Sequence, residues 1–353
     1  MSQRPYVTLE DVARAAQVSL ATASRALNGT TKVRDDLRKR VFAAAESLDY
    51  TPNAHAQALA GGSHRTVGVV CHDVSDPYFA GIARGIMRVA GDNGLMVMLG
   101  STFRDPAKEI AYVSMLRAQR ASAILLIGSG FEDREWERAL AAELDPYRKA
   151  GGQVAVVSRH RSLHVDCVRP ENRAGAAALA KALLGLGHRR FAVLAGPRQL
   201  TTVVDRLDGF RTELAEAGVT LSEEDIAEAA FTRDGGYAAM NELLAGGLRA
   251  SCVFAVTDVM AVGALTALRE AGLSVPGDVS LAGFDDIPVV RDLTPPLTTV
   301  ALPLERLGEQ AMELAIKENP GARSRVVRVD GEVVLRASTA RIDTAQIEVG
   351  SGT

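Results

Sequence analysis

The chain has 353 residues, of which 47% are hydrophobic and 24% are charged, and its formal net charge is −3. This composition is typical of a globular protein of two or three domains and excludes a disordered or fibrous chain. No apolar run approaches the length of a membrane helix and the N-terminus has no apolar signal segment, so we expect a cytoplasmic protein without membrane contact.

Residues 7–28 contain two short amphipathic segments separated by a tight connection. Thr8 and Asp11 have the spacing of a capping box, and Ser19 is a good N-cap for the second segment. Helices this short are not stable alone, and residues 36–48 carry apolar side chains at helical spacing that would cover them. The pattern predicts a helix-turn-helix headpiece whose second helix enters a DNA major groove. A three-helix cap without DNA contact is the alternative.

The charge is divided unevenly, with +2 on residues 1–62 and −5 on the rest. Because one weakly basic headpiece gives little affinity for DNA, two headpieces and hence a dimer are expected. Residues 51–63 follow as a linker. Its Ala-rich stretch after Pro52 predicts about two turns of helix without a core, which would be unfolded when free. Leu59 is its one large apolar side chain, suited to wedge between base steps in a minor groove. A flexible tether is the alternative.

From residue 64 onward, strand-like and helical segments alternate, which predicts parallel sheets covered by helices. Two similar α/β lobes with a cleft between them are expected. The predicted strands are Val67–Cys71, Met96–Leu99, Ala123–Ile127, Val154–Val157, Phe191–Leu194, Cys252–Val256 and Val279–Ala282.

Signatures of an enzyme are absent from the sequence. The first strand–helix loop, CHDVSDPYF, has no glycines, so the dinucleotide fingerprint is missing. There is no GxSxG, no HExxH and no Cys-His pair at nucleophile spacing. We therefore expect no catalytic residue, no cofactor and no metal. Cys71, Cys167 and Cys252 lack a CxxC spacing and lie in or beside apolar stretches, which favours reduced, buried thiols.

Ligands of open α/β sheets bind beyond the carboxyl ends of the strands. The polar and aromatic residues that follow these ends would suit a polyhydroxylated small molecule. Asp258 is instead expected to cap the helix that follows it. The expected ligand-binding residues are His72, Asp73, Asp76, Phe79, Ser158, Arg159, Thr202, Arg206, Phe231, Thr257 and Asp285.

Several strings closely resemble the lactose-repressor (LacI) family of bacterial transcription factors, among them VTLEDVARAAQVSLATASRALNG, VFAAAESLDYTPNAHAQALAGG, GHRRFAVLAGP, DRLDGF, TDVMAVGAL, GLSVPGDVSLAGFDD and PPLTTV. The resemblance covers about residues 6–340. It implies a helix-turn-helix headpiece with a hinge helix, followed by two Rossmann-like α/β lobes of periplasmic-binding-protein type.

The domains expected on this basis are residues 1–50 for the headpiece, 51–63 for the hinge, 64–340 for the two lobes and 341–353 for a flexible tail. The first lobe would contain about 64–165 and 296–323, and the second about 166–293 and 324–340. The tail lacks the leucine heptads of tetrameric members, which again implies a homodimer.

The resemblance also implies a transcriptional repressor that binds double-stranded DNA at a palindromic operator. It places an intercalating leucine at Leu59, and Arg34 stands where the family usually has a capping Ser. Either the third helix is less well capped, or Arg34 contacts phosphate. The expected DNA-contacting residues are Thr8, Leu9, Ser19, Leu20, Ala21, Thr22, Ser24, Arg25, Asn28, Arg34, Asn53, His55, Ala56, Gln57 and Leu59.

A small-molecule effector bound between the lobes would control operator affinity. Arg206 and Asp285 match the family's ligand-binding Arg and Asp, and Phe231 matches an aromatic residue that packs on the ligand. A sugar or sugar derivative is the first expectation. The alternatives are a nucleobase, against which Arg159 replaces the expected aromatic residue, and an anionic metabolite held by Arg159 and Arg206. A solute-binding protein would need a signal peptide and no headpiece.

Overall fold

The computed structural model describes residues 7–28, 33–51, 66–317 and 323–342. The chain divides into two compact units, residues 1–65 and 66–353. Within the described residues, no helix has the length and apolar character needed to span a membrane.

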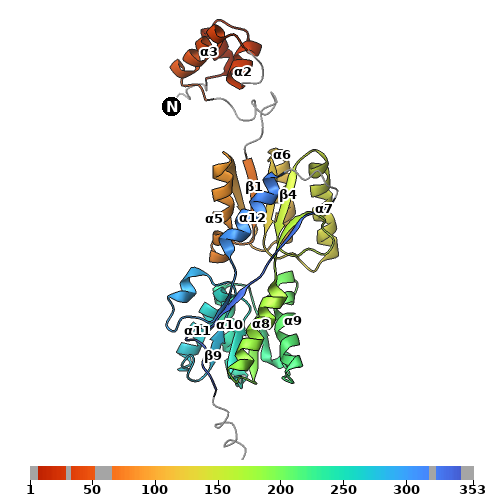
Figure 1. The fold of residues 1–353 in the computed structure, drawn as a ribbon, viewed down its shortest axis with the longest axis vertical. Coiled ribbons are helices and arrows are strands. Elements are labelled where there is room, and N and C mark those ends of the chain that lie inside the picture. Colours follow the sequence, from red (N-terminus) through yellow and green to blue (C-terminus); the bar gives the residue numbers. More distant parts are fainter. Residues whose placement is uncertain (1–6, 29–32, 52–65, 318–322, 343–353) are drawn as a thin grey trace, which may run out of the picture. The chain divides into compact units, whose positions relative to one another are not determined.

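The first unit is the predicted three-helix headpiece, drawn in red in Figure 1. Helix α1 (Leu9–Ala15) begins at the predicted capping box, in which Thr8 and Asp11 each accept a hydrogen bond from the other's backbone N–H. Helix α2 (Leu20–Asn28) follows Ser19, whose hydroxyl accepts from the backbone N–H of Thr22 at 3.2 Å. Helix α3 (Asp35–Ser47) has Arg34 at its N-cap position without a side-chain capping bond. The first of the two alternatives for Arg34, a helix start without a side-chain cap, is therefore present, and a contact with phosphate stays a prediction.

Small side chains let the three short helices pack closely. Val12, Ala23 and Val41 are completely buried at the centre of the headpiece core. Arg40 of α3 donates to the backbone carbonyls of Ala16 and Gln17, so it satisfies acceptors at the end of α1. This arrangement fixes the connection between α1 and α2.

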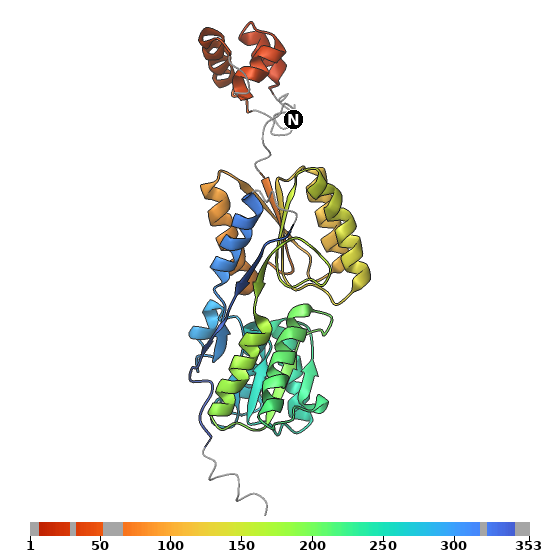
Figure 2. The same ribbon diagram turned by 45° about the vertical axis from the view of Figure 1, so that its right-hand side comes forward.

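The second unit contains two lobes. The first lobe has a six-stranded parallel sheet in the order β11-β5-β4-β3-β1-β2. Helices α5 (Pro77–Asp92) and α12 (Leu304–Ile316) cover one face, and α6 (Pro106–Ala118) and α7 (Arg134–Lys149) cover the other (Figure 2). The strands are β1 (Thr66–Cys71), β2 (Met96–Ser101), β3 (Ala123–Ile127), β4 (Gln153–Val157), β5 (Asp166–Pro170) and β11 (Val326–Val329).

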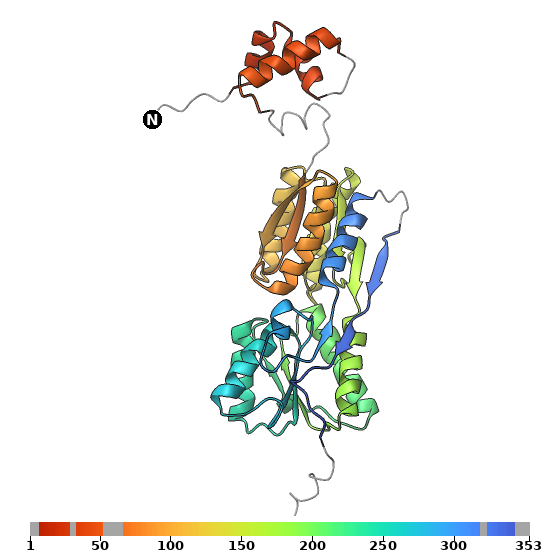
Figure 3. The same ribbon diagram turned by 60° about the vertical axis from the view of Figure 1, so that its left-hand side comes forward.

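Helices α5 and α12 touch backbone to backbone and lie side by side in Figure 3. A Cβ atom at Gly85 would lie 2.0 Å from the carbonyl oxygen of Glu305, and one at Gly308 would lie 1.9 Å from that of Ile82. Only glycine fits at these two positions, because any side chain would push the helices apart.

The second lobe has a four-stranded parallel sheet in the order β7-β6-β8-β9. Helices α8 (Asn172–Gly185) and α9 (Thr201–Glu216) lie on one face, and α10 (Arg233–Ala245) and α11 (Asp258–Glu270) on the other (Figure 3). The remaining elements are β6 (Phe191–Ala195), η1 (Glu223–Asp225), β7 (Ile226–Glu228), β8 (Cys252–Ala255), β9 (Ser280–Ala282), η2 (Pro288–Arg291), and the antiparallel pair β10 (Thr299–Ala301) and β12 (Glu332–Val334).

The expected lobe boundaries at residues 166, 296 and 324 need correction. Strands β5 and β11 pair with each other in the first lobe's sheet, so residues 166–170 and 326–329 belong to the first lobe. Strand β10 bridges to the second lobe at Ala282 and Asp285, and the first lobe resumes at α12. Strand β5 contains Asp166 and Arg169, and β11 contains Arg328, so neither gave the continuous apolar pattern of a buried parallel strand.

The predicted fold class of a helical headpiece followed by two α/β lobes is confirmed. The expected hinge helix lies outside the described residues. Cys71, Cys167 and Cys252 are free thiols, and Cys167 is half-buried where full burial was expected.

Candidate functional site

The exposed face of α2 carries several of the residues expected to contact DNA. Leu20, Ala21 and Arg25 are exposed there, while Ala23 and Ala26 face the headpiece core. The Nε of Arg25 donates to the carbonyl of Ala21 at 3.1 Å. The side chain therefore lies along its own helix, and its two terminal Nη groups lie beyond this hydrogen bond. This face offers one charged donor group beside small and apolar surface, the combination that reads guanine and thymine edges.

The other expected DNA contacts differ in what their side chains do. Thr8 and Ser19 are N-caps, and Thr22 is in hydrogen-bond contact with Ser19 at 2.8 Å between the hydroxyls. Arg34 is exposed and forms an ion pair with Asp36 at 3.1 Å. Leu9 and Ser24 are half-buried, and Asn28 ends α2. Asn53, His55, Ala56, Gln57 and Leu59 lie outside the described residues.

A small pocket lies between the two lobes of the second unit. Its volume is about 20 Å³, room for about one water molecule. Eight of the residues predicted from strand ends are in its lining, and three others were not predicted. The first lobe contributes His72, Asp76, Tyr78, Phe79, Arg104 and Ser129, and the second contributes Thr202, Arg206, Phe231, Thr257 and Asp285.

An Arg–Asp pair forms the floor of the pocket on the second lobe. Arg206 and Asp285 are each 2% exposed, and the Nη2 of Arg206 lies 2.6 Å from Oδ1 of Asp285. Arg206 also donates to Asn172 at 3.0 Å and to the carbonyl of Val256 at 2.7 Å. Burial raises the pKa of Asp285, and the pairing with Arg206 opposes that effect. Arg206 and Asp285 thus line the pocket and at the same time form an ion pair with each other.

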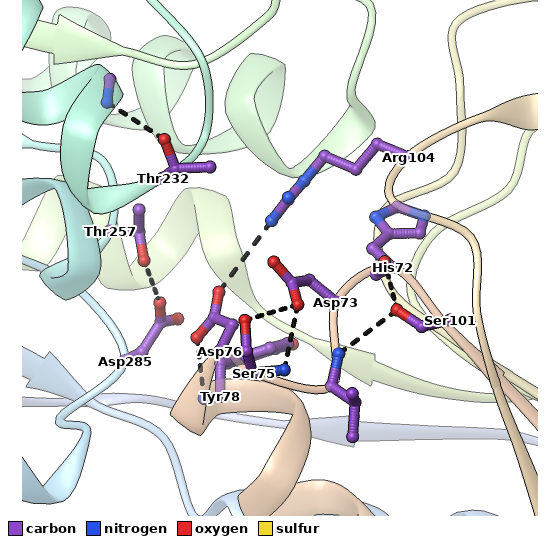
Figure 4. A network of polar contacts seen from close by, with 12 residues as sticks. His72, Asp73, Ser75, Asp76, Tyr78, Ser101, Arg104, Thr232, Thr257 and Asp285 are labelled. Atoms are coloured by element: carbon purple, nitrogen blue, oxygen red, sulfur yellow. Dashed lines mark hydrogen bonds and ion pairs between the residues drawn. The ribbon is translucent and has the colours of Figure 1, made fainter.

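Asp285 is held in an unusual backbone conformation. Its φ is 112°, a left-handed value that a non-glycine residue rarely adopts. The backbone N–H of Asp285 donates to Val300 at 2.9 Å, and its Oδ2 accepts from the Thr257 hydroxyl at 2.7 Å (Figure 4). Such strain persists where the surroundings hold it and is typical of binding sites.

Opposite this floor, the first lobe presents Asp76 and Arg104. Asp76 is the N-cap of α5 and accepts from the backbone N–H of Tyr78 at 2.9 Å. Arg104 lies 3.9 Å from Asp76 (Figure 4). It also lies over the ring of Phe231, 5.2 Å from the ring centre. Burial raises the pKa of Asp76 to about 6 and lowers the pKa of Arg104. Arg104 therefore reaches from the first lobe to an aromatic wall of the second.

Two glycines make room for the aromatic walls. A Cβ at Gly196 would lie 2.1 Å from the Phe231 ring, and one at Gly128 would lie 3.0 Å from the imidazole of His72. Burial, with a contribution from Arg104, lowers the pKa of His72 to about 3. His72 is therefore a neutral, uncharged wall of the pocket at neutral pH.

Three predicted ligand residues, Asp73, Ser158 and Arg159, are not in the pocket lining. Asp73 accepts from the backbone N–H and hydroxyl of Ser75, closing a turn. The Ser158 hydroxyl lies 2.9 Å from Nε2 of His160.

Arg159 pairs with Glu132 of its own lobe and with Asp205 of the second lobe, each at 3.0 Å. Beside these ion pairs, Phe131 forms a single β-bridge with Leu200 of the second lobe. Arg159 therefore joins the lobes outside the pocket.

Tyr78, Arg104 and Ser129 were missed by sequence reasoning. Arg104 and Ser129 follow β2 and β3, so the strand-end rule would have found them had it been applied to these two loops. Tyr78 is adjacent to a predicted residue at the start of α5.

Two further expectations about single residues need correction. Thr202 and Arg206 lie within α9, where they were expected in the loop after β6. The N-cap of α11 is Thr257, and the Asp258 carboxylate instead accepts from Ile287 at 3.0 Å and Thr299 at 2.6 Å. Asp258 thus ties α11 to the segments that follow β9. Among the described residues, no cluster of His, Cys, Asp and Glu is able to hold a metal ion.

Two protein-family models match the chain. The model of bacterial regulatory proteins of the lacI family matches residues 8–53, and that of the periplasmic binding protein-like domain matches residues 180–339. Among curated proteins, the HTH-type transcriptional regulator GalS of Salmonella typhimurium is 37% identical, over 89% of this chain and 91% of that protein.

Solved structures agree with this match. The transcriptional regulator CelR in complex with cellobiose is 30% identical, with a TM-score of 0.70 over 95% of this chain and 100% of that chain. The Lac repressor dimer bound to operator and the anti-inducer ONPF is 26% identical, with a TM-score of 0.79 over 95% and 99%. The headpiece, the two lobes and these matches agree: the chain belongs to the LacI family of bacterial regulatory proteins and is a DNA-binding transcriptional regulator, not an enzyme.

Proposed function

We propose that this protein is a repressor whose affinity for a palindromic operator is controlled by a sugar or sugar derivative bound between the lobes. The observation that carries the proposal is the pocket lined by both lobes. Because the pocket has room for about one water molecule as it stands, a sugar would enter only with a movement of one lobe relative to the other, and its binding would shift that equilibrium. Since bacterial DNA lies in the cytoplasm, we propose that the protein acts there.

The pocket chemistry supports a hydroxyl-rich ligand. Arg206 is a donor only and ionised Asp285 an acceptor only, so together they match a hydroxyl that both donates and accepts. Phe231 and Phe79 supply apolar walls. Cellobiose in the CelR complex shows that a structural relative holds a sugar.

A dimer is supported by the edge of the first lobe's sheet. Strand β2 is the last in the strand order and its other edge has no partner among the described strands. Met96 at its start is 70% exposed, and Met98, Leu99, Tyr112 and Met115 line an apolar groove between β2 and α6. Continuous exposed apolar surface of this kind marks an interface, and the Lac repressor relative is a dimer.

The test begins with operator selection from a pool of random DNA duplexes. The affinity of the selected duplex is then measured by fluorescence anisotropy with and without galactose, ribose, cellobiose, glucuronate, ribose 5-phosphate and hypoxanthine at fixed salt, because salt alone changes such affinities steeply. We expect a palindromic sequence and a change of at least tenfold in affinity with a sugar or a sugar derivative. A change with hypoxanthine alone would favour the nucleobase alternative, and a binding constant unaffected by any small molecule would contradict the proposal.

A further inference from the structure

We propose that the effector carries an anionic group, a carboxylate or a phosphate, and that Arg104 is the residue that binds this group. The inference rests on the proposed function, since it concerns the ligand of the same pocket. It narrows the proposed class of effector from sugars and sugar derivatives to acidic or phosphorylated sugar derivatives.

Arg159 and Arg206, the two cations expected from the sequence to hold an anionic ligand, are already neutralised by carboxylates of the protein. Arg206 is paired with Asp285 at 2.6 Å inside the pocket. Arg159 is paired with Glu132 and Asp205 outside it. Neither guanidinium is free to balance a ligand's charge.

Arg104 is in a different state. Its side chain is only 15% exposed, yet its guanidinium makes no hydrogen bond to any residue in the described part of the chain. The nearest carboxylate oxygen, on Asp76, is 3.9 Å away, beyond hydrogen-bond distance. A buried donor without an acceptor costs free energy, and a guanidinium has five N–H groups to satisfy.

Asp76 compensates Arg104 poorly for a second reason. Its Oδ1 accepts from the backbone N–H of Tyr78, and its charge faces the positive end of α5. The carboxylate is thus already engaged as a helix cap. The remaining contact of Arg104 is the face of Phe231, which attracts a cation but accepts no hydrogen bond.

The backbone directs this side chain toward the cleft. Phe103 and Arg104 have φ values of 54° and 61°, both in the left-handed region, in the connection between β2 and α6. Strain in two consecutive non-glycine residues is maintained only where it has a structural or binding role. A planar guanidinium held in this way fits a carboxylate or phosphate through two parallel hydrogen bonds. The anion would supply the hydrogen-bond acceptors that Arg104 lacks among the described residues, and a negative charge closer to Arg104 than that of Asp76.

The experiment compares matched neutral and anionic ligands on the full-length protein. Melting temperatures are measured with ribose, ribonate and ribose 5-phosphate, with glucose, glucuronate and glucose 6-phosphate, and with inorganic phosphate and sulfate at constant ionic strength. Compounds that raise the melting temperature are titrated calorimetrically. In the wild type we expect an anionic member to bind at least tenfold more tightly than its neutral parent. The carboxylate and phosphate arms show which anion is preferred.

Arg104→Gln should reduce this preference for the anion to about onefold, and Arg104→Lys should retain part of it because the charge remains. Lys108→Gln is the matched control. It also removes one positive charge, but Lys108 is exposed near the start of α6 and is not in the pocket lining. Thermal melts without ligand establish that each variant is folded. If Arg104→Gln is not folded, the comparison is made with Arg104→Lys.

Three results would overturn the inference: tighter binding of a neutral sugar than of its anionic forms, an equal loss of neutral and anionic ligands in Arg104→Gln, or no anion in the panel that stabilises the wild type more than Arg104→Gln. The first two would leave a small-molecule regulator intact. The proposed function fails separately, if a compound that binds leaves operator affinity unchanged.

Discussion

Replacing Arg206 tests how the buried pair in the pocket floor contributes to stability. Arg206→Met removes the guanidinium and leaves the Asp285 carboxylate, 2% exposed, with the Thr257 hydroxyl as its remaining side-chain partner. Removing one partner of a buried ion pair typically costs about 3–5 kcal/mol. At roughly 2 °C per kcal/mol for a unit of this size, the melting temperature should fall by about 6–10 °C.

The comparison variant is Arg173→Met. Arg173 of α8 pairs with Asp208 of α9, but both side chains are at least half exposed, so the loss should stay below about 1 kcal/mol. Urea denaturation followed by circular dichroism, together with thermal melts, measures both variants. An equal loss in the two variants would show that burial does not decide the strength of these pairs and would refute the reasoning.

The pH dependence gives a second readout. Burial already raises the pKa of Asp285 in the folded protein, and without Arg206 that pKa should rise further. An acid that binds its proton more tightly in the folded state destabilises the fold as pH rises above the unfolded pKa. The Arg206→Met deficit should therefore be larger at pH 7.5 than at pH 5.

A double variant separates stability from ligand binding. Replacing a buried ion pair by apolar residues is often neutral for stability, so Arg206→Met with Asp285→Leu should recover much of the loss. It should still fail to bind the effector, because the donor and acceptor are gone. Wild-type effector affinity in this double variant would remove both residues from the ligand site.

The remaining predictions concern the headpiece, the hinge and one buried acid. Arg25→Ala should cost about 1–3 kcal/mol on the selected operator and much less on random DNA, measured by anisotropy; equal losses would mean that Arg25 contacts only phosphate. Amide hydrogens of residues 53–60 should become protected from exchange only when operator is bound, and Leu59→Ala should reduce DNA bending; strong protection in the free protein would contradict a coupled folding step. Burial raises the pKa of Glu109 to about 8. Because the folded state holds this proton more tightly than the unfolded state, the free energy of unfolding falls as pH rises from about 4.5 to 8. Glu109→Gln should therefore raise the free energy of unfolding, measured by urea denaturation, by about 4 kcal/mol at pH 8 and little at pH 4.5, while the exposed control Glu216→Gln should change it little at either pH.

The sequence predicted those parts of the fold that depend on local patterns. The capping box at Thr8 and the apolar strand Ala123–Ile127 are present as predicted, because each depends on residues adjacent in the chain. Strands β5 and β11 were missed, because what makes them strands is their pairing with each other across more than 150 residues.

The candidate site shows the same division. The strand-end rule found Asp76 and Asp285, whose positions follow from the elements that precede them. It misplaced Arg159, because the side chain is drawn away by Glu132 and Asp205, which come from two other segments. The lack of a hydrogen-bond acceptor for Arg104 could not be predicted either. It depends on how all the surrounding segments fold, and no single residue in the sequence signals it.

The close contact of α5 and α12 has a mechanical consequence. With carbonyl oxygens of each helix filling the space that a Cβ would take at Gly85 and Gly308, the pair has no side-chain layer in which to slide. The start of α5, which carries Asp76 and Phe79, is thus locked to a helix from the far end of the sequence. A displacement of the start of α5 would therefore move α12 with it, because no side-chain layer between the two helices could absorb the shift.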